Sequence, residues 1–142
     1  VAVDGAGNVF VADTGNHRIR KIAPDRTVST YAGDGTAGFR DGPCCARFRG
    51  PNGVAVDDQG NAFVADTGNN RIRKIAPDRT VSTYAGDGTR GFRDGPVRSA
   101  RFSWPFGVAV DGQGNVFVAD MYNHRIRIIT DPHRAKVSRC AL

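Results

Sequence analysis

The chain has 142 residues, of which 39% are hydrophobic and 24% are charged, and its formal net charge is +6 at pH 7. This composition is typical of a folded globular domain and argues against an intrinsically disordered chain. No apolar run approaches the roughly 18 residues that a membrane span requires, and no leader-like segment opens the chain, so we expect no membrane partner. The sequence leaves the compartment open.

The predicted elements, taken in chain order, are short β-strands separated by turn residues. The middle of the chain shows the complete set, with strands over 53–57, 62–66, 71–75 and 81–85. β-Branched and aromatic residues fill these strands, and Gly, Asn, Asp and Pro fill the segments between them, which is the pattern of consecutive hairpins. One unit is therefore predicted to be a four-stranded antiparallel meander.

The same phrase recurs three times along the chain. Val-Phe-Val-Ala-Asp closes on Asp13 and Asp120, and the near copy Ala-Phe-Val-Ala-Asp closes on Asp66. Self-similarity at a fixed period is the signature of a repeat architecture. Within the single segment 1–142, we place the repeats at approximately 1–50, 51–104 and 105–142.

The first two strands of each repeat are predicted to be buried on both faces. Residues 54–56 and 62–65 are apolar at successive positions, which is typical of strands covered on both sides. The third strand alternates, with Ile72 between Arg71 and Arg73. A gradient from buried first strands to polar last strands is what radial stacking of blades requires. We predict an all-β fold, a partial β-propeller of about three blades, with the first and last blades incomplete.

Three phrases recur in order within the repeats, namely Pro-x-Gly-Val-Ala-Val-Asp, Gly-Asn-Val-Phe-Val-Ala-Asp and Asn-His-Arg-Ile-Arg. Together they resemble the signature of the NHL repeat family over nearly all of residues 1–130. The resemblance implies a closed ring of about six blades. Because the chain begins inside the first phrase, we expect an excerpt of a longer protein. The remaining blades would come from missing sequence or from a second copy of the chain.

Strand parity places the turn between the second and third strands at the same end of the sheet as the connection between blades. We call this end the long-loop face; it contains residues 14–17 and 34–50 and their counterparts 67–70 and 87–104. Arginines and aromatic residues alternate there, as they do in protein interfaces and in single-stranded nucleic acid sites. The candidate partner-binding residues are Arg40, Arg47, Arg49, Arg90, Arg93, Arg98, Arg101 and Trp104.

The long loops also have a structural interpretation. A connection of about 17 residues needs anchors, and we expect Phe39 and Phe48 to fill the gap between two blades.

A second polar set, an Asp followed at fixed spacing by Asn and Arg, recurs in every repeat. A catalytic site is normally single, so a set present in each blade is interpreted as a turn lock, in which Asp accepts hydrogen bonds from turn amides and can pair with the Arg. Its members are Asp13, Asn16 and Arg18, then Asp66, Asn69 and Arg71, then Asp120, Asn123 and Arg125.

His17 and His124 occupy equivalent places in the first and third repeats. Imidazoles facing a central channel could hold zinc, as in the amidating lyase that resembles this family, but two histidines without a third ligand make a weak metal site. No catalytic residue, metal or cofactor is predicted.

We therefore expect a non-enzymatic scaffold that binds a protein or peptide through the long-loop face. Two alternatives remain. The same arginines could bind RNA, or the chain could be part of a metal-dependent propeller enzyme, either a lyase or a lactonase-like hydrolase.

Overall fold

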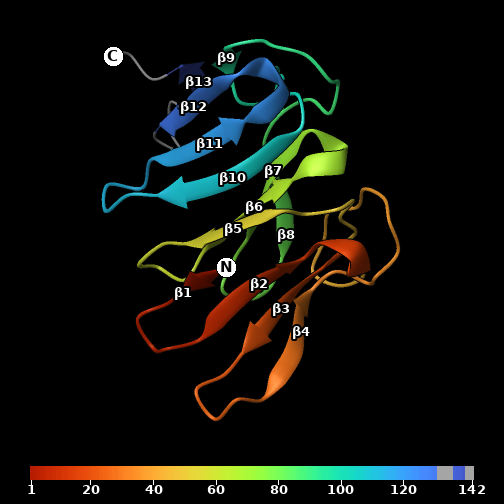
Figure 1. Ribbon diagram of the computed structural model, residues 1–142, viewed down its shortest axis with the longest axis vertical. Coiled ribbons are helices and arrows are strands. Elements are labelled where there is room, and N and C mark those ends of the chain that lie inside the picture. The colour runs from red at the N-terminus through yellow and green to blue at the C-terminus, as the bar shows by residue number, and fades with distance from the viewer. Residues whose placement is uncertain (131–135, 140–142) are drawn as a thin grey trace.

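The computed structural model describes residues 1–130 and 136–139, and these form three antiparallel β-sheets in succession along the chain (Figure 1). The first sheet contains β1 (Ala2–Val3), β2 (Val9–Asp13), β3 (Arg18–Ile22) and β4 (Val28–Ala32). The second contains β5 (Gly53–Val56), β6 (Ala62–Asp66), β7 (Arg71–Ile75) and β8 (Val81–Ala85). The third contains β10 (Pro105–Val110), β11 (Val116–Asp120), β12 (Arg125–Thr130) and β13 (Lys136–Arg139), with β9 (Gly95–Pro96) beside β13.

The predicted meanders are confirmed, with two corrections at their ends. The predicted strand over 53–57 ends at Val56, because the carboxylate of Asp57 accepts hydrogen bonds from the backbone of the following turn. The third blade is not short of strands, since β13 pairs with β12 and supplies the fourth strand that sequence had not assigned. The first blade does have a reduced inner strand, because β1 has two residues.

The turn between the second and third strands has the same conformation in each blade. A single turn of 3-10 helix, η1 (Thr14–Asn16), η2 (Thr67–Asn69) or η3 (Met121–Asn123), is followed by a residue in the left-handed conformation. His17, Asn70 and His124 occupy this place, with φ angles of 54°, 51° and 52°. Asn and His are among the non-glycine residues that adopt this conformation most readily.

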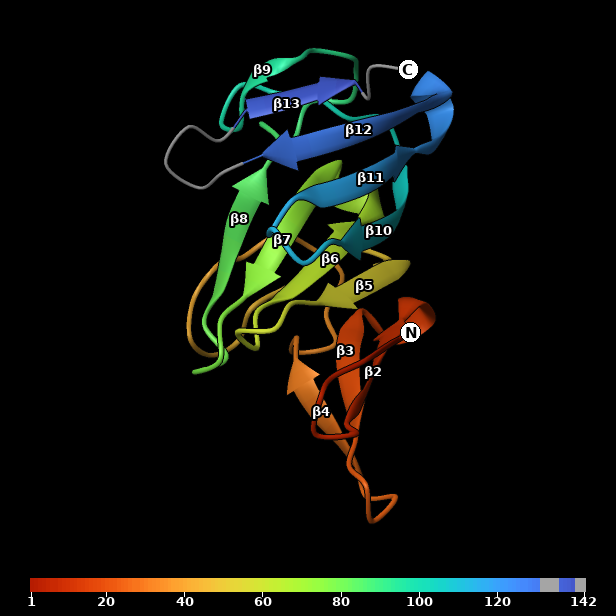
Figure 2. The same ribbon diagram turned by 90° about the vertical axis from the view of Figure 1, so that its left-hand side faces the viewer.

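The three sheets stack face to face, with the inner strands β5 and β10 side by side (Figure 2). Two apolar cores lie between them. One face of the middle sheet packs Val64 and Ile75 against the first blade, and the other packs Phe63 and Ile72 against the third. Every residue of β6 is buried, which confirms the prediction from its unbroken apolar run. A helix that could span a lipid bilayer is absent from the described residues.

The aromatic residues of the long loops divide into two kinds. Phe48 and its counterpart Phe102 are fully buried between blades, as anchors. The expectation for Phe39 is wrong, because its side chain is 44% exposed, and its counterpart Phe92 is 38% exposed. Phe39 instead lies under the guanidinium of Arg71, whose central carbon is 3.8 Å from the ring centroid.

Candidate functional site

The long-loop face is built by hydrogen bonds between each long loop and the turn of the following blade. Asn69 donates from Nδ2 to the carbonyl of Gly38 at 2.8 Å and to Oδ2 of Asp66 at 2.8 Å. Oδ1 of Asp66 accepts from the backbone N–H of Arg49 at 2.8 Å. The Asp and Asn of the turn lock therefore hold the turn and also fasten the incoming loop to it.

The third blade repeats this arrangement, and the first blade retains part of it. Asp120 accepts from the backbone N–H of Ser103 and from Nδ2 of Asn123, both at 2.8 Å. Asp13 accepts from Asn16 at 3.0 Å, and its carboxylate is partly exposed.

The arginine that pairs with the Asp of the turn lock is not the predicted one. The partner of Asp66 is Arg73, two residues beyond the predicted Arg71, and its Nη1 lies 2.7 Å from Oδ2 of Asp66. Arg73 is fully buried, and it also binds Asp41 at 2.7 Å and the carbonyls of Arg40 and Arg47. Burial raises the pKa of Asp66, while the guanidinium of Arg73 acts in the opposite direction. Arg73 therefore ties the whole long loop to the second blade.

Arg127 makes the same contacts in the third blade, to Asp120 at 2.7 Å and to Asp94 at 2.8 Å. The predicted lock residues Arg18 and Arg71 instead donate to the carbonyls of Asp34 and Asp87, each at 3.1 Å. Arg125, the third predicted member, lies over the ring of Phe92 at 3.9 Å, measured from its guanidinium carbon to the ring centroid.

The candidate partner-binding arginines differ in what they contact. Arg47 and Arg101 form ion pairs with Asp34 and Asp87, each at 2.8 Å. The hydrogen bond from Arg47 holds the pKa of the Asp34 carboxyl below its ordinary value. These two arginines therefore stabilise their own loops. The remaining candidates are exposed: Arg40, Arg49, Arg90, Arg93 and Arg98.

A comparison of the first two repeats shows that one of these arginines, Arg90, is present in the second repeat only. Residues 18–43 and 71–96 are identical except at one position, where Arg90 replaces Ala37. The guanidinium of Arg90 lies 5.2 Å from the ring centroid of Tyr122, and its Nε donates to Oγ of Ser103 at 2.9 Å. The only difference in this stretch thus contacts Ser103 at the end of its own loop and Tyr122 in the turn of the third blade.

Those two contacts also differ from their counterparts in the preceding repeat. Ser103 replaces Arg49, Trp104 replaces Gly50, and Tyr122 replaces Gly68. The rings of Trp104 and Tyr122 lie 5.8 Å apart between centroids, with 37% and 49% of each residue exposed. We call Arg90, Ser103, Trp104 and Tyr122 the third-blade patch. Sequence analysis named Arg90 and Trp104 as candidates but missed Tyr122, although aligning the repeats position by position reveals it.

The backbone of Trp104 is unusual for a large residue. Its φ angle is +59°, in the left-handed region, where Gly50 has +57° in the preceding blade. The backbone N–H of Trp104 donates to Oδ1 of Asn70 at 3.0 Å, as that of Gly50 donates to Nδ1 of His17 at 3.0 Å. Trp104 therefore occupies a position whose geometry favours glycine.

The weak metal candidates His17 and His124 share the left-handed position that follows the turn in their blades but differ in their contacts. His17 accepts a hydrogen bond that fastens the next blade, and His124 lies exposed at the equivalent place of the third blade. Among residues 1–130 and 136–139, no group of three or more His, Cys, Asp or Glu side chains is arranged to hold a metal ion.

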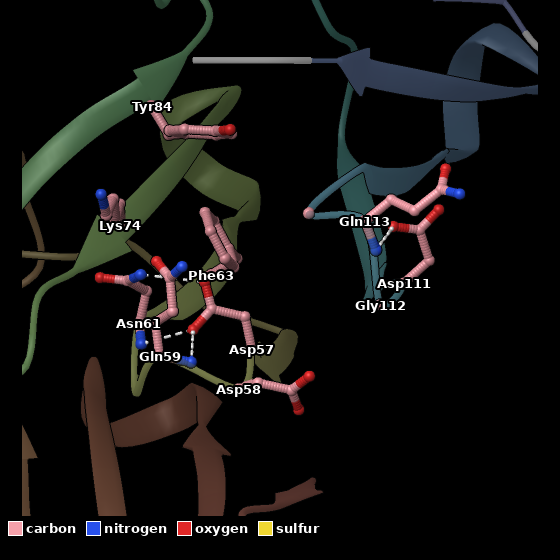
Figure 3. A pocket seen from close by; sticks show the side chains of 11 residues that line it. Asp57, Asp58, Gln59, Asn61, Phe63, Lys74, Tyr84, Asp111, Gly112 and Gln113 are labelled. Atoms are coloured by element: carbon pink, nitrogen blue, oxygen red, sulfur yellow. Dashed lines mark hydrogen bonds between the residues drawn. The ribbon is translucent and has the colours of Figure 1, made fainter.

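A cleft of about 320 Å³ opens at the opposite end of the blades, between the second and third (Figure 3). Its rim consists of the turns 57–61 and 111–114, and Phe63, Lys74 and Tyr84 also line it. Two of the three rim carboxylates serve their own turns: Asp57 accepts from two backbone N–H groups of its turn, as Asp111 does. A turn of this kind occurs in every blade, so the cleft follows from the repeat and we assign it no separate role.

Comparison with known proteins identifies the repeat. A family model described as "NHL repeat" matches residues 1–22, 48–75 and 102–129. The chain is 41% identical over 80 residues to the protein SUPPRESSOR OF QUENCHING 1, chloroplastic, of Arabidopsis thaliana, covering 56% of the chain and 8% of that protein. It is 38% identical over 94 residues to NHL repeat-containing protein 2 of Gallus gallus, covering 64% of the chain and 13% of that protein.

Solved structures give the architecture. A structural genomics protein of unknown function from Bacteroides thetaiotaomicron superposes with a TM-score of 0.80 at 27% identity, over 94% of this chain and 33% of that one. A streptogramin B lyase superposes with a TM-score of 0.68 at 17% identity, over 99% of this chain and 39% of that one. These structures are β-propellers, so the predicted fold is confirmed. The chain therefore spans well under half the length of each.

Proposed function

Because the chain belongs to the NHL repeat family, we propose that it forms part of a propeller scaffold that binds a protein or peptide partner through the long-loop face, with the third-blade patch at the centre of the interface. The observation that carries this proposal is the pair of exposed aromatic residues, Trp104 and Tyr122, at two positions where the preceding repeat has glycine.

Composition supports a protein partner at this place. Tyr, Trp and Arg are the residues that contribute most often to the energy of protein interfaces, and three of the four residues of the patch are of these types. Both rings are large and already packed against one another, so few rotamers are lost when a partner binds. The backbone conformation of Trp104 also supports it, since strained residues cluster at functional sites.

The alternative functions have less support. RNA binding would use the exposed arginines, but single-stranded nucleic acid is bound along a groove with successive stacking platforms. The other exposed rings of the long loops, Phe39 and Phe92, are each covered by an arginine. The enzyme alternative rests on the likeness to the lyase, which at 17% identity concerns the fold alone.

Peptide display tests the proposal. A random dodecapeptide library is panned against the full-length protein, and selected peptides are measured by fluorescence anisotropy against W104G and Y122G, which restore the residues of the preceding repeat. We expect both variants to weaken binding about tenfold or more, as interface aromatic residues do. F39A, which removes an exposed aromatic ring outside the patch, is the matched control. Failure to select any peptide, or selection of peptides that bind both glycine variants normally, would contradict the proposal.

A further inference from the structure

We infer that Arg90 is a carboxylate-binding residue, and that the segment docking on the third-blade patch carries an Asp or Glu next to an apolar side chain. This inference rests on the proposed function and adds the chemistry of the partner.

The guanidinium of Arg90 is fixed by two contacts that leave its terminal nitrogens available to a ligand. Its Nε donates to Oγ of Ser103 at 2.9 Å, and the ring of Tyr122 lies beside the guanidinium at 5.2 Å. No acceptor for Nη1 or Nη2 is present in the described part of the chain. Two N–H groups in a fixed plane match the two oxygens of a carboxylate. A residue already fixed in this way loses little conformational entropy on binding.

The carboxylates of the long loops are already engaged elsewhere. Each of them forms an ion pair with an arginine other than Arg90: Asp34 with Arg47, Asp41 with Arg73, Asp87 with Arg101, and Asp94 with Arg127. Arg90 and the exposed Arg93 and Arg98 of the same loop therefore lack an internal counter-charge among these aspartates. Charge complementarity favours an acidic partner here.

The apolar half of the site is the surface of Trp104 and Tyr122 beside that guanidinium. Two adjacent rings, tilted by 32° to one another, next to one fixed cation suit an apolar side chain whose neighbour carries the carboxylate. A nucleic acid would need further platforms along its path, and a phosphate would gain from several cations around it. We therefore assign the carboxylate to a peptide segment.

A peptide array tests the inference. Peptides with a central Leu-Phe pair and flanks rich in Asp and Glu, in Asn and Gln, or in Lys and Arg are probed with the full-length protein, alongside an oligouridine RNA. We expect the acidic flanks to bind tightest, and R90A to weaken that binding about tenfold, the usual effect of losing a charged hydrogen-bonding pair. R90A is expected to fold normally, because Ala37 occupies the same place in residues 18–43, a stretch otherwise identical to residues 71–96.

A charge-matched variant separates a specific site from general attraction. R90A/A37R has the same net charge as the native chain but carries the arginine one blade away from Trp104 and Tyr122. We expect it to bind as weakly as R90A. Full binding by this variant, no effect of R90A, preference for neutral or basic flanks, or preference for the RNA would each overturn the inference. Loss of binding in W104G and Y122G without an effect of R90A would leave the proposed function standing and remove only the carboxylate contact.

Discussion

Tyr122 donates its backbone N–H to the carbonyl of Ser103 at 3.1 Å, in the place where Gly68 donates to the carbonyl of Arg49 at 2.8 Å. In the earlier blade a β-carbon on Gly68 would lie 2.6 Å from that carbonyl oxygen and 2.7 Å from Cγ of Arg49. A side chain at position 68 would therefore require both the loop backbone and the Arg49 side chain to move. In the third blade both residues differ, with a larger residue at one position and a smaller one at the other, and the hydrogen bond is longer, so we expect the two replacements to be coupled.

The coupling predicts that S103R destabilises the native chain and is tolerated in a Y122G background. An arginine at this position would compete with the tyrosine for the same space, and such overpacking costs about 1–3 kcal/mol. A double-mutant cycle, built from urea unfolding of the four proteins, measures the coupling free energy. Additive effects of S103R and Y122G would show that the two positions do not share space.

We predict a large loss of stability in R73M and a small one in R20M. R73M leaves the fully buried Asp66 without its cation, which costs about 3–5 kcal/mol. Arg20 is the equivalent residue of the first blade, and its pair with Asp13 is about 30% exposed on both sides; exposed pairs contribute about 0–1 kcal/mol. The measurement is the free energy of unfolding in urea. Equal losses in the two variants would mean that burial of the pair has no energetic consequence.

For Trp104 we predict that the smaller of two substitutions destabilises the protein less. W104A keeps a β-carbon at a φ of +59° and loses the ring, whereas W104G loses the ring and removes the strain. We expect W104G to be more stable than W104A by about 1 kcal/mol, as measured by thermal or urea unfolding. An alanine variant as stable as the glycine variant would show that this backbone position is not strained.

Acid is predicted to destabilise the propeller through its turn carboxylates. Hydrogen bonds from Asn8 and Asn115 hold the pKa values of Asp4 and Asp111 below 3.8, and that from Arg47 does so for Asp34. Because the folded-state pKa is the lower one, the ionised groups stabilise the fold above the unfolded-state value, and this contribution disappears as the pH falls through the folded-state pKa.

These groups should therefore leave the urea concentration at the unfolding midpoint nearly unchanged between about pH 7 and 5. At pH values below about 4, the midpoint should decrease. D4N/D111N, which removes two of the titrating carboxyls, should show a shallower fall than the native chain. A midpoint that rises on acidification, or an unchanged profile in the variant, would argue against this assignment.

The repeat units and their strands were predictable because each depends on local patterns. Residues 62–66 form β6 with the predicted limits, since a short apolar run with a β-branched and an aromatic residue between turn residues is typical of a strand covered on both sides. Phe48 could be predicted as an anchor, but the exposure of Phe39 could not. Both are aromatic residues of one loop, and the path of that loop decides which of them reaches the core.

The amino-acid sequence by itself determined the period, the meanders and the end of the blades to which the arginines belong, because strand alternation and turn chemistry act over a few residues. Only the tertiary structure decided which arginine meets which carboxylate. Asp66 lies opposite Arg71 in the sheet yet pairs with Arg73, since Asp41 and the carbonyls of the long loop gather around that one guanidinium from more than 25 residues away in the chain. The same holds for the third-blade patch, whose members come from a loop and a turn that adjoin only when two blades are stacked.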